Sequence, residues 1–295
     1  MLAAQWKVPL LPVQHHHAHV AACMAEHGLQ GPMLGFSWDG TGYGPDGTVW
    51  GGEVLVCDGA TFHRAAHLRT FPLAGGDRAI REPRRSALGV LFEIFGDHAR
   101  ERAAQWFNSE QLDTLMSMLA RQVNSPRTSS MGRLFDAVAA ICGLPPTISF
   151  EGQAAMALEF AADADEQSAY RFSLSGDGVV DWEPVVRSVL DDRRDGVSVG
   201  RIGARFHNGL AEMAVAVAQT ITSSTAHSSL PVVLSGGCFQ NALLTSRVCR
   251  CLSAAGFSVY TQRQVPPGDG GIALGQVLVA LRQLQGSSHV PRSSR

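Results

Sequence analysis

Short apolar runs punctuated by glycine alternate along this chain with longer segments in which apolar residues recur at helical spacing. In the first half, the apolar runs predict strands at Met33–Trp38, Val49–Cys57 and Phe62–Leu68. The glycine-rich stretch 40–47 predicts a hairpin turn between the first two strands. The helical spacing predicts helices at Ala79–Phe95, Glu101–Gln122 and Gly132–Cys142. This alternation predicts an α/β architecture.

A break at residues 143–146, Gly-Leu-Pro-Pro, predicts a boundary between two lobes, residues 1–145 and 146–285. The polar residues 286–295 predict a disordered tail. The second half repeats the α/β pattern. It predicts helices at Glu151–Ala162, Phe206–Thr225, Phe239–Ala255 and Gly271–Leu284, and strands at Tyr170–Leu174, Leu230–Leu234 and Phe257–Thr261.

Composition narrows the class of protein. A net charge of -2 over 295 residues gives no electrostatic case for nucleic acid or a membrane as the main partner. The sequence shows no signal peptide or membrane-spanning stretch, so we expect a cytoplasmic protein with reduced cysteines. Lys7 is the only lysine, which excludes a Walker A loop and Schiff-base chemistry. A bound phosphate must therefore be held by backbone amides, arginine or a metal ion.

A histidine run, Gln14-His15-His16-His17-Ala18-His19, lies where the sequence turns helical. His15 and His19 are four residues apart, so they share a helix face and can bind one metal ion. His16 and His17 then point to other faces. The alternatives are a purification tag or a solvated polar turn. A tag usually lies in flexible polar sequence, whereas the residues after this run are apolar.

Three glycine-rich turns lie where predicted strands end, the place where α/β sheets bind ligands. The stretch 37–44 includes Asp39, a carboxylate suited to a metal or metal-bound water, although a plain hairpin explains it equally well. The stretch 235–241 opens a helix whose amides would face a phosphate or ribose. The stretch 266–271 includes Asp269, for which helix capping, worth about 1 kcal/mol, is a sufficient structural explanation. Together with His15 and His19, the two aspartates would form a nitrogen and oxygen site suited to iron, zinc or manganese.

These residues belong to a larger set of motifs through which the chain resembles the C-terminal carbamoyltransferase domain of the hydrogenase maturation factor HypF. The motifs occur in one order over nearly the whole chain. They are Val13-Gln14-His15-His16-His17-Ala18-His19, Asp39-Gly40-Thr41-Gly42-Tyr43-Gly44, Gly75-Gly76-Asp77-Arg78-Ala79 with Arg81-Glu82-Pro83, Thr128-Ser129-Ser130-Met131-Gly132-Arg133-Leu134-Phe135-Asp136, Phe150-Glu151-Gly152-Gln153-Ala154-Ala155, Phe206-His207-Asn208, Ser235-Gly236-Gly237-Cys238-Phe239-Gln240-Asn241, and Asp269-Gly270-Gly271-Ile272-Ala273-Leu274-Gly275-Gln276.

The resemblance implies a two-lobed actin-like ATPase (ASKHA) fold with a nucleotide cleft between the lobes. It also implies a divalent metal, iron or zinc, and a nucleotide bound as ATP, AMP or carbamoyladenylate. The implied metal ligands are His15, His19, Asp39 and Asp269. The implied nucleotide site has phosphate-facing backbone at Gly40, Thr41, Gly42, Gly236 and Gly237, nucleoside contacts at Asp136, Gly152 and Asn241, and the neighbouring Glu151.

The implied reaction passes a carbamoyl group from carbamoyladenylate to the C-terminal cysteine thiol of HypE, for the cyanide ligands of nickel-iron hydrogenase. It needs no nucleophile from this chain; Cys238 is the rival nucleophile because it lies at a predicted helix start. The chain departs from complete HypF proteins in lacking the domains that precede this one and, we expect, the first strand of the domain. A separate HypF fragment would then supply carbamoyladenylate. Alternatives are a HypE-docking module without activity and a small-molecule O-carbamoyltransferase.

Overall fold

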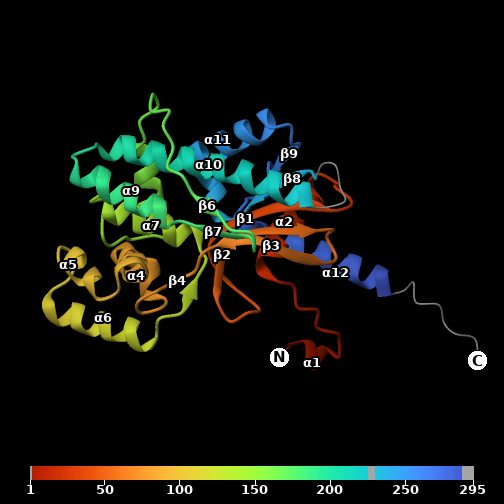
Figure 1. Cartoon of the computed structure of the whole chain (residues 1–295). Helices are drawn as coiled ribbons and strands as arrows, with labels where there is room; N and C mark the ends of the chain where they lie inside the picture. The colour runs from red at the N-terminus through yellow and green to blue at the C-terminus, as the bar shows by residue number, and fades with distance from the viewer. Residues whose placement is uncertain (1, 225–229, 288–295) are drawn as a thin grey trace, which may run out of the picture.

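One mixed sheet runs through the molecule in the order β6-β7-β3-β2-β1-β8-β9, with β4 and β5 attached at β2 (Figure 1). The computed structural model describes residues 2–224 and 230–287. β1 pairs antiparallel with β2 and parallel with β8, which confirms the predicted α/β class. The strands are β1 (Met33–Tyr43), β2 (Val49–Cys57), β3 (Phe62–Leu68), β4 (Phe71–Pro72), β5 (Arg127–Thr128), β6 (Ser173–Leu174), β7 (Val179–Asp181), β8 (Val232–Ser235) and β9 (Val259–Thr261).

The first strand is longer than predicted. β1 continues past Trp38 to Tyr43, through the stretch expected to be a hairpin turn. Trp38 pairs with Gly52 and Gly42 pairs with Trp50, so β1 has more residues than β2 between these two pairs. The result is a bulge at residues 39–41, which bends a strand and re-aims its side chains. Asp39 lies in this bulge.

Helices fill the connections between the strands. They are α1 (Leu2–Trp6), α2 (His15–Glu26), α3 (Arg78–Arg81), α4 (Pro83–Phe95), α5 (Ala99–Ala103), α6 (Ser109–Arg121), α7 (Met131–Ile141), α8 (Gln153–Ala161), α9 (Glu183–Arg194), α10 (Val199–Ser224), α11 (Ala242–Ala254) and α12 (Ile272–Ser287), with short 3-10 turns η1 (Gly96–His98), η2 (Gly237–Gln240) and η3 (Asp269–Gly271).

Two predicted helices in the first half are each divided. The helix expected at Ala79–Phe95 breaks before Pro83, which occupies the first turn of α4, where its missing N–H costs nothing. The helix expected at Glu101–Gln122 is interrupted after α5. Asn108 then caps α6 in a reciprocal capping box with Gln111. Local capping chemistry therefore overrides an apolar pattern that continues across both breaks.

The second half differs mainly at element ends. β7 and α9 were not predicted, and the strand expected at Tyr170–Leu174 is reduced to β6. α10 begins before the expected residue 206. The helix expected from Phe239 starts only after η2, because the Asn241 side chain caps α11. Residues 286 and 287 of the expected tail belong to α12; residue 225 and residues 288–295 lie outside the described residues.

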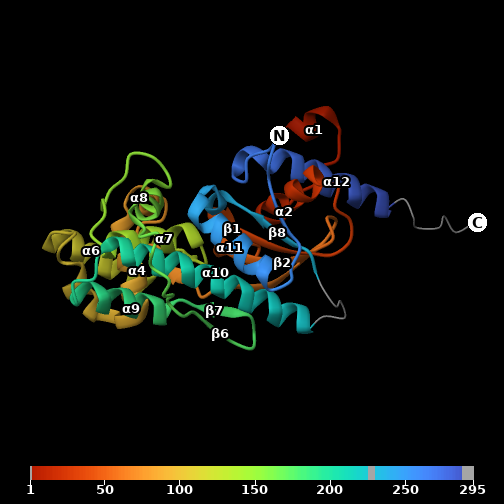
Figure 2. The same ribbon diagram turned by 90° about the horizontal axis from the view of Figure 1, so that it is seen from above.

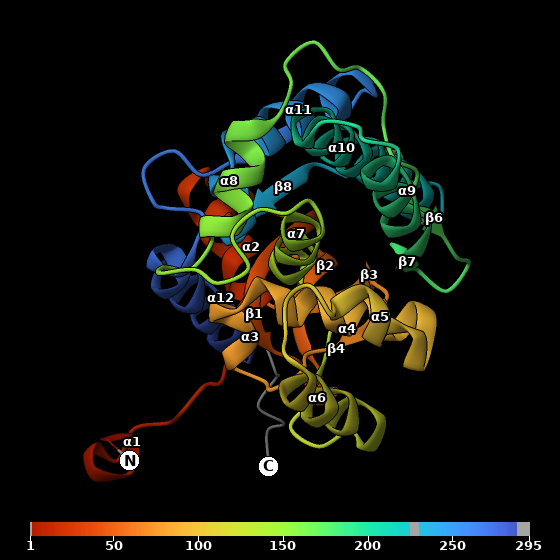
Figure 3. The same cartoon turned by 90° about the vertical axis from the view of Figure 1, so that its left-hand side faces the viewer.

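Helices cover both faces of the sheet, as Figures 2 and 3 show. α2 and α12 lie against one face, where Val20, Cys23 and Met24 form an apolar cluster with Leu55 and Val233. α7, α10 and α11 lie on the other face, over a cluster that includes β1 residues 34, 36 and 38. Strands from both sides of residue 145 share the one sheet, and the division into two lobes at that residue remains a prediction.

No helix within residues 2–224 and 230–287 is both long enough and apolar enough to cross a membrane.

α2 is held between the sheet and α12 by two glycines. A Cβ atom at Gly35 of β1 would lie 2.4 Å from Cγ2 of Val20. At Gly275 of α12 it would lie 1.8 Å from the backbone oxygen of Ala18. The second contact is with backbone, which cannot rotate away. α2 is therefore fixed from both sides.

Gly275→Ala is expected to destabilise the protein by about 1–3 kcal/mol, the usual cost of overpacking a buried contact. The added methyl group must push α12 away from α2. Thermal unfolding measures the effect, with Gly176→Ala as the matched control, because a Cβ at Gly176 meets no atom within 4 Å. Equal melting temperatures for the two variants would contradict this packing.

Candidate metal and nucleotide site

The histidine run forms the first turns of α2. Gln14 caps the helix, since its side-chain oxygen accepts a hydrogen bond from the His17 backbone N–H at 2.9 Å. The side chain of His19 is 1% exposed and that of His15 is 23% exposed. Burial of the run inside an ordered helix is incompatible with a flexible tag or a solvated turn.

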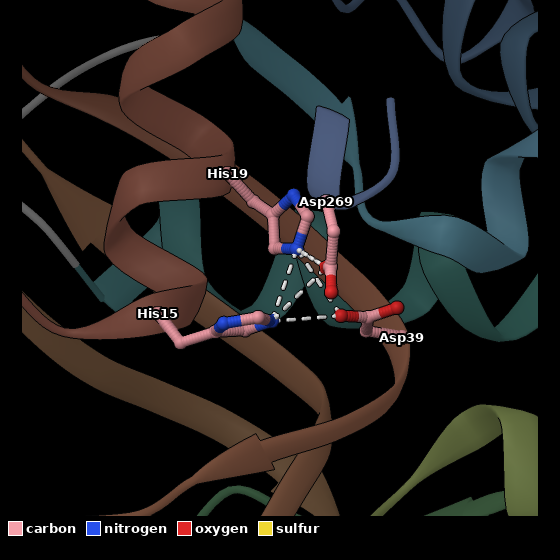
Figure 4. A group of neighbouring side chains, drawn as sticks. All are labelled: His15, His19, Asp39 and Asp269. Atoms are coloured by element: carbon pink, nitrogen blue, oxygen red, sulfur yellow. Dashed lines mark hydrogen bonds and ion pairs between the residues drawn. The ribbon is translucent and has the colours of Figure 1, made fainter. Parts of the chain in front are cut away.

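Four side chains from three distant parts of the chain converge beside this helix (Figure 4). Nε2 of His15 and Nε2 of His19 lie 2.9 and 3.1 Å from Oδ2 of Asp39. The same two nitrogens lie 3.6 and 3.5 Å from Oδ1 of Asp269. One donor atom from each residue lies within 4.8 Å of all the others. The structure thus brings together the four residues predicted as metal ligands.

Asp39 is held firmly by the backbone around it. Its Oδ1 accepts hydrogen bonds from the N–H groups of Gly40 at 2.9 Å and Gly237 at 3.0 Å, which leaves Oδ2 facing the histidines. Burial alone would raise the pKa of Asp39, but hydrogen bonds with His15 and His19 outweigh it and hold this pKa well below its usual range. Asp39 is therefore a carboxylate ready to bind a cation.

The donor set fits a transition-metal ion. Two imidazole nitrogens and two carboxylate oxygens suit iron, zinc or manganese better than calcium, which prefers more oxygen ligands. The two carboxylates would also balance the charge of a divalent ion. The identity of the ion remains a prediction.

Groups behind the ligands fix the position of α2. The Ser235 hydroxyl donates to the backbone oxygen of His19 at 2.8 Å, and Gln262 Nε2 donates to that hydroxyl at 2.7 Å. A Cβ atom at Gly42 would lie 2.4 Å from Cε1 of His16, so only glycine lets the helix approach β1 this closely.

His16 and His17 are not among the four converging donors. Nδ1 of His16 lies 3.1 Å from Nε2 of Gln14, and the His17 ring packs against Phe62. Burial lowers the pKa of His16 to about 3 and that of His17 to about 4, so both rings are neutral. The prediction that these two histidines face other directions is confirmed.

A cavity of about 400 Å³ opens next to the cluster, with Asp39 and Asp269 in its wall. Six residues predicted to bind nucleotide also line it: Gly40, Thr41, Asp136, Glu151, Gly152 and Gly237. Asp136 is fully buried, and this burial raises its pKa to about 6, against the opposing effect of Arg133. The structure therefore connects the predicted metal ligands with most of the predicted nucleotide residues.

Three predicted nucleotide residues lie outside the wall of this cavity. Gly42 packs against His15 and His16 of α2. Gly236 packs against the backbone of Trp38. Asn241 caps α11 and donates from Nδ2 to Nε2 of His207 at 2.9 Å. Their predicted contacts with a nucleotide remain predictions.

Sequence reasoning missed several lining residues, namely Ile80, Gly132, Arg133, Ala155 and Gln240. Arg133 could have been identified from the sequence. It precedes Asp136 by three positions on a helix, so the two side chains share a face.

Comparison with known proteins identifies the family of the chain. Residues 35–276 match the family described as "Carbamoyltransferase, Kae1-like Domain, second subdomain", and residues 1–26 match the "HypF Kae1-like domain". The chain belongs to the HypF carbamoyltransferase family. The resemblance stated from the sequence motifs is confirmed.

Relatives within the HypF family cover nearly all of the chain. The carbamoyltransferase HypF2 of Cupriavidus necator is 41% identical over 96% of the chain, which spans 38% of that protein. A HypF homolog from the same organism is also 41% identical over 96% of the chain, which here spans 73% of the relative. A crystal structure of full-length HypF, described as the phosphate- and nucleotide-bound form, superposes with a TM-score of 0.90 at 42% identity, over 97% of this chain and 46% of that one.

Proposed function

We propose that this chain transfers a carbamoyl group from carbamoyladenylate to the C-terminal cysteine thiol of HypE, as part of nickel-iron hydrogenase maturation. One observation carries the proposal: Asp39 and Asp269 belong both to the four-residue donor cluster and to the wall of the adjoining cavity. A nucleotide in that cavity would place its phosphate where the cavity meets the donor cluster. A HypF of similar structure is described as a phosphate- and nucleotide-bound form, which supports nucleotide binding in this family.

The residues of the chain would act by binding and orientation. His15, His19, Asp39 and Asp269 would hold a divalent ion, which when bound supplies positive charge next to a phosphate. The backbone at Gly40, Thr41 and Gly237 faces the same space and would position the phosphate. Asp136, Glu151 and Gly152 would hold the nucleoside. The nucleophile comes from the acceptor, so the chain contributes proximity and charge stabilisation.

The proposal extends to three properties of the whole protein. The two-lobed actin-like arrangement would place the nucleotide between an N-terminal and a C-terminal half. The partner would be HypE, which supplies the acceptor thiol. The reaction would take place in the cytoplasm.

A transfer assay tests the function. The metal-loaded protein is incubated with HypE and synthetic carbamoyladenylate, and mass spectrometry is used to look for one added carbamoyl group on the terminal cysteine of HypE. HypE lacking that cysteine is the control. Binding of HypE without transfer would favour the docking module. Carbamoylation of a small hydroxyl compound in place of HypE would favour the O-carbamoyltransferase.

Cys238→Ala is expected to leave the transfer rate within about 2-fold of wild type. Cys238 lines the cavity, but burial raises its pKa well above the usual range, so the reactive thiolate is disfavoured. Single-turnover kinetics of the variant measure the rate. A large loss of transfer, together with a carbamoyl group trapped on Cys238 in the wild-type protein, would restore this cysteine as the nucleophile.

A further inference from the structure

Arg133 is a buried arginine at the cavity whose role the motifs leave unassigned. Its side chain is 2% exposed. All the lining residues are among those that the structure describes, and Arg133 is the only basic side chain among them, whereas Asp39, Asp136, Glu151 and Asp269 are acidic. A phosphate entering this cavity would meet mostly negative charge. Arg133 is the one side chain there able to attract it.

The guanidinium group of Arg133 lies between the two ends of the site. Nη1 lies 3.0 Å from Oδ2 of Asp136, on the side predicted to hold the nucleoside. A Cβ atom at Gly40 would lie 3.3 Å from Nη2, which places Nη2 against the bulge that carries Asp39. A phosphate joined to the nucleoside and reaching the donor cluster would have to pass this group.

The hydrogen bonds of Arg133 are incomplete within the described residues. Nε and Nη1 are buried and have no hydrogen-bond acceptor among the described residues; Nη1 forms an ion pair with Asp136, whereas Nε has none. Nη2 lies 3.6 Å from Oε1 of Glu151, beyond hydrogen-bond distance. Buried N–H groups almost always have an acceptor, so unpaired ones beside a cavity indicate an acceptor supplied by a ligand.

Arg133 is also held rigidly in place. It is the third residue of α7, whose N-cap Ser130 donates its hydroxyl to the backbone oxygens of Asp39 at 2.9 Å and Gly40 at 2.7 Å. A Cβ atom at Gly132 would lie 2.8 Å from Cα of Gly40, so helix and bulge are in direct contact. Arg133 and the Asp39 bulge therefore keep a fixed separation.

From this geometry we infer that Arg133 donates hydrogen bonds to the phosphate of the bound nucleotide and stabilises the charge that this phosphate gains during transfer. The second part rests on the proposed function. The acceptor thiol gives its proton to water, a sulfur–carbon bond forms, and the bond between the carbamoyl carbon and the phosphate oxygen breaks. The electron pair stays on that oxygen, so AMP leaves with one more negative charge. A fixed guanidinium stabilises this product more than the reactant.

Binding of AMP and adenosine tests the inference without the reaction. Arg133→Gln is expected to weaken AMP binding by about 10- to 100-fold, the effect of losing a charged hydrogen bond, while adenosine binding changes by less than about 3-fold. Arg133→Lys keeps the charge but loses the planar fork, so we expect an intermediate loss for AMP. Isothermal titration calorimetry gives both affinities.

Arg247→Gln is the matched control because Arg247 is buried, donates to the backbone oxygen of Ala204 and lies outside the cavity wall. The inference would be overturned if the Arg133 variants lost affinity for AMP and for adenosine equally, or if their AMP binding were unchanged. If Arg133→Gln fails to fold, Arg133→Lys tests the inference instead. A selective loss of AMP affinity relative to adenosine affinity supports it, and an unchanged ratio overturns it. If the wild-type protein transfers nothing to HypE, the proposed function fails, while this comparison still tests phosphate binding.

Discussion

Asp269→Ala is expected to abolish stable metal binding and carbamoyl transfer while the fold remains intact. Asp269 supplies one of four converging donor atoms, and its side chain is 76% exposed. Its removal therefore leaves no buried hole. Loss of groups that merely orient metal ligands costs about 10- to 100-fold in affinity, so loss of a ligand should cost more. Metal content after dialysis, measured by inductively coupled plasma mass spectrometry, shows the loss directly.

His15→Ala should give the same result, because it removes a nitrogen donor from the other side of the cluster. His63→Ala is the control: His63 is an exposed histidine on β3, outside the cluster. Circular dichroism and thermal unfolding verify that the variants are folded. Full metal content in either Asp269→Ala or His15→Ala would show that these four residues do not form the metal site.

Gly40→Val is expected to block nucleotide binding while the metal ligands stay in place. A Cβ atom at Gly40 would lie 2.7 Å from Oε1 of Glu151 and 3.3 Å from Nη2 of Arg133, inside the wall of the cavity. An overpacking cost of about 1–3 kcal/mol corresponds to about 5- to 150-fold weaker AMP binding. The backbone N–H of Gly40 still reaches Asp39, so metal content should be unchanged.

Calorimetric titration of AMP and metal analysis on the same sample separate these two effects. Gly176→Val is the control, since a Cβ atom there would meet no atom within 4 Å. Wild-type affinity of Gly40→Val for AMP would place the nucleotide elsewhere. Loss of metal together with AMP binding would mean that the substitution disturbs Asp39 itself.

The ligand pair on α2 was predictable because its cause is local. The helical spacing of His15 and His19 and the capping position of Gln14 are contained in the six consecutive residues 14–19. Asp39 could also be located, because the strands that precede the glycine turns end at one edge of an α/β sheet. β1 and β8 do pair in parallel, with Ser37 opposite Ser235, so the bulge in β1 and the turn after β8 lie side by side.

Other features depend on contacts that no local pattern records. The bulge in β1 becomes visible only when its pairing with β2 is known. Arg133 becomes part of the site because α7 docks on that bulge through Ser130, more than 80 residues away in sequence. The missed helix α9 has only three buried residues, all valines, on an otherwise polar segment. Long-range packing therefore completes a site of which local sequence specifies half.

The spread of the donor residues along the chain has a consequence for biosynthesis. His15 and His19 leave the ribosome about 250 residues before Asp269, and α2 gains its second packing surface only when α12 is made. Domains fold as units once their sequence is complete, and contacts between distant residues form late. The complete donor set therefore assembles only after Asp269 and α12 have been synthesised, and metal capture by all four residues cannot precede that point.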